Sequence, residues 1–263
     1  MVSSPEDPTR LVLVLGGARG GKSTFAERLA AQRAASGDGV TYLATSETND
    51  PEMAARVAAH RAARPAAWVT LECPLEPAAA VRSTAAATSA DGRPAVGSSP
   101  GAGSLGPVFL LDCVTFWVSN LMFSAGELGG TVPEGLGNFD KAFIPREVED
   151  AVAARIGGAV DDLLAALRET GSTMIAVSNE VGLGVVPEYP IARLYRDELG
   201  RVNRRLAEAA GEVYLLVAGI PLEIKALAAD PFAASEVDAA GPSPRALHLA
   251  PPPLSPTEEE HHE

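Results

Sequence analysis

The residues whose types and spacing most clearly suggest chemistry are a run of glycines followed by a lysine and a serine. This run fits the pattern G-x-x-x-x-G-K-[ST] and consists of Gly16, Gly17, Ala18, Arg19, Gly20, Gly21, Lys22 and Ser23. In a P-loop of this kind, backbone N–H groups and the positive end of a helix surround a phosphate. We expect Lys22 to reach the β and γ phosphates of a nucleoside triphosphate and Ser23 to ligate Mg²⁺. A glycine turn that binds nothing would not need the Gly-Lys-Ser ending, so the pattern favours phosphate binding.

A second candidate metal ligand is Asp112, which directly follows the apolar run Val108–Leu111. A P-loop usually needs a carboxylate at the end of a neighbouring buried strand to hold its metal ion. Such an aspartate can instead cap the segment that follows the strand. The P-loop upstream favours the interpretation of Asp112 as a Mg²⁺ ligand.

The third feature is a basic stripe around His60. Asp50 and Pro51 have the types expected at the start of a helix, and Arg56, His60 and Arg64 then recur every four residues on one face. The stripe is either a solvated helix face or a set of arginines that bind a triphosphate beside a nucleophilic imidazole. Helical spacing alone does not choose between these two interpretations.

Alternating strands and helices position these residues. Short apolar runs predict strands and periodic apolar positions predict helices. The expected strands cover residues 11–15, 40–44, 108–111, 173–178 and 213–218, and the expected helices cover 22–36, 50–65, 148–171 and 191–210. This order predicts an α/β fold of the P-loop NTPase type (RecA-like), with a mostly parallel sheet and helices on both faces.

The composition also predicts where the folded part begins and ends. We expect a disordered N-terminus over residues 1–9, a single domain over 10–229 and a disordered tail rich in Pro, Ala and acidic residues over 230–263. Residues 83–107 are mostly Ala, Ser, Gly and Pro, so we expect a flexible insertion there. Residues 126–140 are glycine-rich and predict a loop.

Net charge and cysteine content limit the classes of binding partner and the cellular compartment that we expect for this protein. The 263-residue chain has a formal net charge of −13, which disfavours nucleic acid and anionic membranes as partners and favours a small molecule. Cys73 and Cys113 are far apart and lack metal-ligand spacing, so we expect two reduced thiols in a cytoplasmic protein. No apolar run approaches the roughly 20 residues that span a bilayer, and the start lacks signal-peptide character.

Taken together, these segments resemble one family, the bifunctional adenosylcobinamide kinase/adenosylcobinamide-phosphate guanylyltransferases of cobalamin biosynthesis. The matching stretches are the P-loop, 42–46, 50–56 continuing through 60–61 and 64–65, Trp68, 110–113, 119–121, 178–187 and 201–220. A P-loop alone is unspecific, but the segment Asn-Glu-Val-Gly-x-Gly-x-Val-Pro together with the His-Arg stripe is characteristic. Gly20 departs from the family, in which a serine is usual at this position.

The resemblance implies a function and a set of site residues. It implies phosphorylation of adenosylcobinamide by ATP or GTP, followed by transfer of GMP from GTP through a guanylylated His60. It also implies a GTP site that includes Thr45, Ser46, Glu47, Arg61, Ala62, Ala63, Arg64, Glu72 and Asp112. Arg61 and Arg64 suit phosphate, Glu72 suits a guanine edge, and Ala62 and Ala63 offer only backbone contacts. The family further implies a homotrimer and a substrate-facing loop at 179–187, although glycines there could simply form a turn.

Two other classes of function stay open on the residues alone. One is a P-loop kinase of another small alcohol without guanylyl transfer, in which His60 is only a surface residue. The other is a GTPase-type switch, which the absence of an Asn/Thr-Lys-x-Asp motif in the chain disfavours. Neither the base for the acceptor hydroxyl nor the preference between ATP and GTP for the kinase step follows from the sequence.

Overall fold

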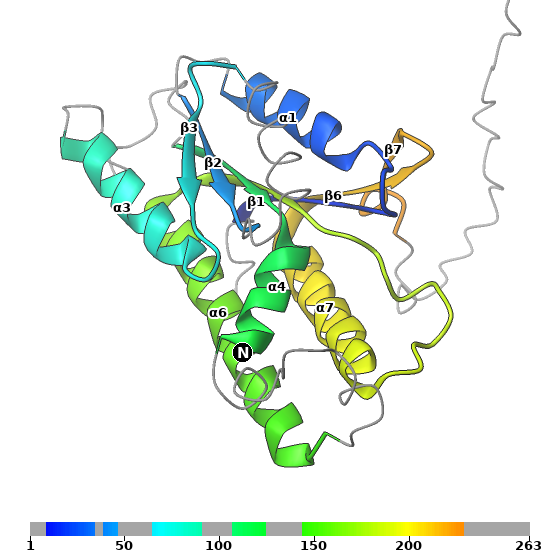
Figure 1. The fold of residues 1–263 in the computed structure, drawn as a ribbon. Coiled ribbons are helices and arrows are strands. Elements are labelled where there is room, and N and C mark those ends of the chain that lie inside the picture. Colours follow the sequence, from blue (N-terminus) through cyan, green and yellow to red (C-terminus); the bar gives the residue numbers. More distant parts are fainter. Residues whose placement is uncertain (1–8, 35–38, 47–64, 91–106, 125–143, 229–263) are drawn as a thin grey trace, which may run out of the picture. The chain divides into compact units, whose positions relative to one another are not determined.

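The computed structural model describes residues 9–34, 39–46, 65–90, 107–124 and 144–228 (Figure 1), all within one compact unit, Met1–Ala228. In these ranges seven strands form one sheet in the order β3-β2-β4-β5-β1-β6-β7. The strands are β1 (Thr9–Gly16), β2 (Val40–Ala44), β3 (Val69–Glu72), β4 (Val108–Asp112), β5 (Thr173–Val177), β6 (Ala210–Val217) and β7 (Ile220–Glu223).

The sheet is parallel except at one edge, where β7 pairs antiparallel to β6. The strand β5 lies between β1, which leads into the P-loop, and β4, which ends at Asp112. In the ladder, Asp112 is opposite Ala44 on one side and Val177 on the other, so these strands end at the same edge. The predicted mostly parallel α/β sheet is confirmed.

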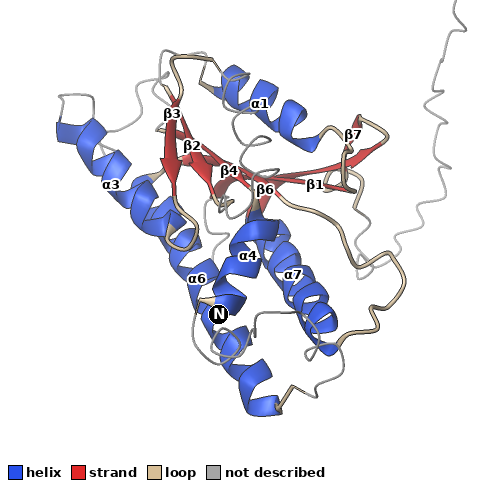
Figure 2. Cartoon of the chain, in the orientation of Figure 1, coloured by secondary structure: helices blue, strands red, loops and turns tan. Residues whose placement is uncertain are grey.

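Helices cover both faces of the sheet (Figure 2). They are α1 (Lys22–Arg33), α3 (Pro77–Ala90), α4 (Val114–Phe123), α6 (Arg146–Thr170) and α7 (Pro190–Ala209). Leu11 and Leu13 of β1 point into a core shared with α4, α6 and α7, whereas Val12 and Val14 point into a smaller core under α1. This alternation explains why β1 is a continuous apolar run, because both of its faces are buried.

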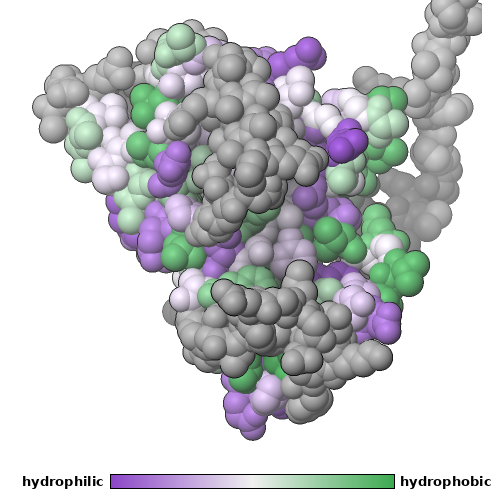
Figure 3. Space-filling view, in the orientation of Figure 1, coloured by the Kyte–Doolittle hydropathy of each residue, from purple (hydrophilic) through white to green (hydrophobic). Residues whose placement is uncertain are grey.

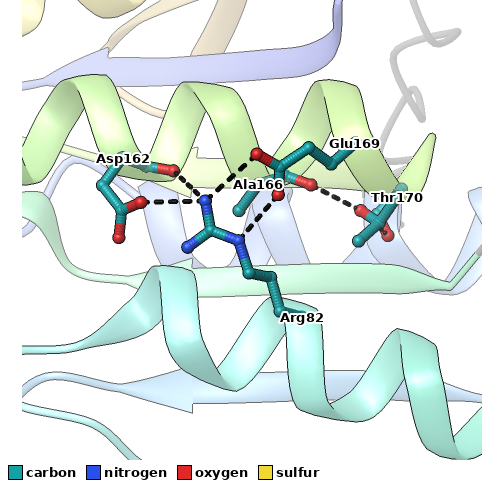
Figure 4. Close-up of polar contacts among 6 residues, drawn as sticks. Arg82, Asp162, Ala166, Glu169 and Thr170 are labelled. Carbon is teal, nitrogen blue, oxygen red and sulfur yellow. Dashed lines mark hydrogen bonds and ion pairs between the residues drawn. The ribbon is translucent and has the colours of Figure 1, made fainter.

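Part of the expected insertion is helical instead. Residues 83–90 belong to α3, since alanine favours helix strongly and Ala78 and Val81 of the same helix are buried against the core. Arg82 fixes α3 to α6, with its Nε 2.7 Å from Glu169 Oε2 and its Nη2 2.8 Å from Asp162 Oδ1 (Figure 4). These carboxylates raise the pKa of the exposed Arg82 guanidinium.

Two further strands and a helix, β3, β7 and α4, were not predicted from the sequence. The strands β3 and β7 have only four residues each and are largely exposed, so they lack an apolar run, and α4 directly follows β4 without a break signal. The turn between β6 and β7 places Ala218 at φ 51° and Gly219 at φ 81°, as a two-residue hairpin turn requires. No helix within the described ranges has both the length and the apolar composition to cross a membrane.

Candidate nucleotide-binding site

The P-loop joins the end of β1 to the start of α1. Arg19 at φ 56° and Gly21 at φ 83° adopt left-handed conformations, and Gly20 N–H donates a hydrogen bond to the Gly17 carbonyl at 3.2 Å. Gly21 is the N-cap of α1 and supplies no side-chain cap, and the first turn of the helix carries no acidic residue. An N-terminus with this composition keeps its positive potential for an anion.

Glycine is required at Gly16 by the neighbouring strand. A Cβ atom built there would lie 2.6 Å from the Leu216 carbonyl oxygen of β6, and the backbone has φ 151°. The Gly16 carbonyl also accepts a hydrogen bond from Glu180 N–H at 3.2 Å, which ties the segment after β5 to the P-loop. A side chain at Gly16 would therefore displace the strand that supports the loop.

Lys22 lies within the loop rather than in solvent. Its side chain is buried, and its Nζ donates a hydrogen bond to the Gly17 carbonyl at 2.7 Å. Burial lowers the pKa of Lys22, and the nearby Cys113 and Asp112 act against this shift. A bound phosphate would supply the negative partner that this buried cation needs.

Asp112 and Thr45 lie at the ends of adjacent strands. The Tyr42 hydroxyl donates a hydrogen bond to Asp112 Oδ2 at 2.8 Å. Thr45 is fully buried, and its hydroxyl accepts from Cys113 N–H at 2.8 Å and donates to the Cys113 carbonyl at 2.7 Å. Asn120 donates to the Thr45 carbonyl at 2.8 Å. Thr45 thus fixes the backbone beside Asp112, and its expected contact with nucleotide stays a prediction.

A buried polar network holds the segment after β5. Ser178 donates to Asn203 Oδ1 at 2.6 Å, and Asn203 Nδ2 donates to the Asn179 carbonyl at 3.0 Å. The Asn179 N–H in turn donates to Thr115 Oγ1 at 3.1 Å. The start of the 179–187 loop is therefore fixed by α7, by α4 and by the P-loop.

The rest of that loop exposes apolar side chains. Leu183, Val185 and Val186 are 88%, 96% and 60% exposed. Hydrophobic residues gather on this side of the molecule, over the segment between β5 and α7 and near β7 (Figure 3). A substrate with apolar surface could cover such side chains.

The structure brings some of the predicted site residues together. The P-loop residues, Thr45 and Asp112 meet at the carboxyl edge of the sheet, next to Ser46, while Glu72 ends β3 opposite Ala44. Residues 50–64 of the expected helix and all of residues 126–140 lie outside the described residues, as do Glu47, His60, Arg61, Ala62, Ala63 and Arg64. Sequence reasoning gave no role to Tyr42, Asn120 or Asn203, although an asparagine on the apolar face of a helix is a usable signal.

The oxygen donors of Ser23 and Asp112 fit Mg²⁺, which prefers a few protein oxygens and fills its other positions with water and phosphate oxygens. Within the described ranges, no group of three or more His, Cys, Asp or Glu side chains could hold a metal. A P-loop metal does not need such a cluster, because nucleotide supplies part of its coordination.

Comparison with known proteins supports one family. The family described as cobinamide kinase / cobinamide phosphate guanyltransferase matches residues 12–91 and 100–224. The bifunctional adenosylcobalamin biosynthesis protein CobU of Salmonella typhimurium is 40% identical over 217 residues, which cover 82% of this chain and 99% of that protein. The bifunctional adenosylcobalamin biosynthesis protein CobP of Pseudomonas aeruginosa is 39% identical over 213 residues, covering 81% and 96%. Among solved structures, one ATPase domain is 13% identical with a TM-score of 0.42 over 80% of this chain and 70% of that one.

Proposed function

The chain belongs to the cobinamide kinase/cobinamide phosphate guanyltransferase family, and from this premise we propose that it phosphorylates adenosylcobinamide with ATP or GTP and then transfers GMP from GTP to the resulting phosphate. The observation that carries the proposal is the P-loop at the start of α1, with Lys22 buried beside Asp112. The product of the two steps is adenosylcobinamide-GDP.

In the kinase step, the bond between the γ phosphorus and its bridging oxygen breaks, so that the nucleoside diphosphate leaves. A new bond forms from this phosphorus to the aminopropanol hydroxyl oxygen of the acceptor, which loses its proton. Lys22 exchanges its contact with the Gly17 carbonyl for the transferring phosphoryl group and stabilises the charge on its oxygens. Ser23 and Asp112 would hold Mg²⁺, which when bound would neutralise charge on the phosphates. The N-terminus of α1 binds the remaining phosphate oxygens.

In the guanylyl step, His60 attacks the α phosphorus of GTP and pyrophosphate leaves. A cobinamide phosphate oxygen then attacks the same phosphorus, and the bond to the imidazole breaks. Two displacements on a covalent intermediate replace one difficult displacement. Thr45, Ser46, Glu47, Arg61, Ala62, Ala63, Arg64, Glu72 and Asp112 are the residues to which we assign the GTP site, by resemblance to the family.

The 179–187 loop is the part of the site to which we assign the acceptor. Its exposed apolar side chains suit the large, methyl-rich ring of a corrinoid, and its start is fixed to Gly16 next to the P-loop. We further propose a cytoplasmic homotrimer, again by resemblance. Sedimentation of the purified protein tests the trimer.

The test of the guanylyl step is incubation of the protein with Mg²⁺ and GTP labelled at the α phosphorus, followed by denaturation. We expect acid-labile, alkali-stable label on the wild type and on the control variant His248→Ala, and none on His60→Ala. A wild type that binds GTP and never retains label contradicts the guanylyl-histidine. The chain would then be a P-loop kinase without guanylyl transfer.

A further inference from the structure

A buried tyrosine contacts the carboxylate at the centre of the site. Tyr42 is 3% exposed and lies in β2, opposite Leu110 of β4. Asp112 follows Leu110 by two residues, so both side chains point to the same face of the sheet. That face is covered by α1, because Tyr42 and Leu110 share a core cluster with Leu29.

Apolar packing explains the aromatic ring of Tyr42 but not its hydroxyl group. A phenylalanine would fill the same space in this apolar cluster without a polar group to satisfy. The hydroxyl instead donates to Asp112 Oδ2 at 2.8 Å. Its acceptor is the carboxylate to which the proposed function assigns the metal ion.

One hydrogen bond to one carboxylate oxygen restricts rotation of the whole group. With Oδ2 held by Tyr42 from the β2 side, Asp112 would present Oδ1 to a metal ion at the P-loop. The Asp112 backbone is restrained as well, because its carbonyl accepts from Thr45 N–H at 3.4 Å and the next residue is clamped by the Thr45 hydroxyl. Both the position and the orientation of the carboxylate are therefore restrained by contacts within the protein.

We propose that Tyr42 is a positioning residue that orients Asp112 for Mg²⁺ in the nucleotide complex. This inference rests on the metal assignment in the proposed function. Partners that orient metal ligands typically change metal affinity by about 10- to 100-fold when they are removed. The step affected is metal-dependent nucleotide binding, without any change in the contacts of Lys22.

The test uses the full chain with Tyr42→Phe, which keeps the ring and removes the hydroxyl. Binding of a GTP analogue with a methylene bridge between its α and β phosphorus atoms is measured calorimetrically over a Mg²⁺ titration and in EDTA. We expect the Mg²⁺ concentration at half-maximal binding to rise about 10- to 100-fold, and affinity in EDTA to stay within about twofold of wild type. A purely structural role would leave the Mg²⁺ midpoint unchanged.

A matched control is available on another strand. Tyr214 also donates to a carboxylate, Glu212 Oε2, at 2.8 Å, and Tyr214→Phe should leave the Mg²⁺ midpoint at the wild-type value. Asp112→Asn should abolish the metal dependence, and adding Tyr42→Phe to it should change nothing more. An unchanged midpoint in Tyr42→Phe overturns the positioning role alone. An unchanged midpoint in Asp112→Asn overturns the metal assignment in the proposed function, and the positioning role with it.

Discussion

Two of the sets of polar contacts between elements of this molecule differ in burial. At the carboxyl edge of the sheet, Thr45, Ser178 and Asn203 are each 5% exposed or less, and their partners are backbone groups or side chains of neighbouring elements. Between α3 and α6, Arg82 binds Asp162 and Glu169 on the surface. Buried polar groups depend on their partners, whereas exposed ion pairs exchange theirs for water. The edge near the P-loop is therefore the sensitive region.

The largest effect is expected from Lys22→Ala. We expect the rate of γ-phosphoryl transfer at saturating substrate to fall by about 10³-fold or more, because the buried ammonium stabilises the transferring group. Thermal stability should hold or rise, since the burial that lowers the pKa of Lys22 opposes folding. The control is Lys225→Ala, whose Nζ also donates to backbone carbonyls. A single-turnover rate constant for Lys22→Ala that is less than about tenfold below wild type would show that Lys22 does not stabilise the transferring phosphoryl group.

Next in size is the loss of the network around Asn203. Asn203→Leu keeps much of the volume but leaves the Ser178 hydroxyl and the Asn179 carbonyl without a partner, which should lower the free energy of unfolding by about 2–4 kcal/mol. Urea unfolding of the nucleotide-free protein measures this change. Ser178→Ala combined with Asn203→Leu should cost less than the sum of the two single changes. Additive costs would show that the two side chains are not coupled.

Thiol reactivity probes the same contrast between buried and exposed groups. Burial raises the pKa of both Cys73 and Cys113 to about 11. Their reaction with a disulfide reagent at about pH 8 should be about 100-fold slower in the folded protein than in denaturant, and should accelerate as pH rises towards about 10. Because these thiols ionise at lower pH when unfolded, the free energy of unfolding should fall as pH rises above about 9. Rapid reaction of both thiols in the folded protein would contradict their raised pKa.

The smallest effect is expected on the surface. Arg82→Gln removes both ion pairs between α3 and α6, and the midpoint of thermal unfolding should move by less than about 2 °C, because exposed pairs are screened by solvent. The difference from wild type should shrink further in about 1 M salt. A larger shift that persists in salt would show that this surface contact contributes as much to stability as the buried contacts at the carboxyl edge of the sheet.

The sequence predicted those parts of the fold whose signals are local. The P-loop, the strand before it and Asp112 combine a continuous apolar run with chemistry-bearing residues at its end, and the parallel sheet followed from their order. The short strands β3 and β7 carry no apolar run. The composition of residues 83–107 predicts a flexible insertion, but residues 83–90 belong to α3 because their many alanines favour helix, and residues 91–106 lie outside the described residues. Local composition was therefore a weaker guide than periodicity.

The sequence predicted the site residues that belong to local motifs, but not the contacts between residues far apart in the chain. The contact between Tyr42 and Asp112 joins residues 70 positions apart, and the clamp of Thr45 on Cys113 joins residues 68 apart. Such contacts depend on strand order and register, which a single sequence does not reveal. Part of the predicted GTP site, including His60, lies outside the described residues and stays a prediction from resemblance.

One measurement tests the central proposal most directly. Purified protein is incubated with adenosylcobinamide, GTP and Mg²⁺, and the corrinoid products are separated by chromatography and identified by mass spectrometry. We expect adenosylcobinamide phosphate followed by adenosylcobinamide-GDP, with the phosphate accumulating in His60→Ala. Corrinoid recovered unchanged by the folded, nucleotide-binding wild type would contradict the proposed function.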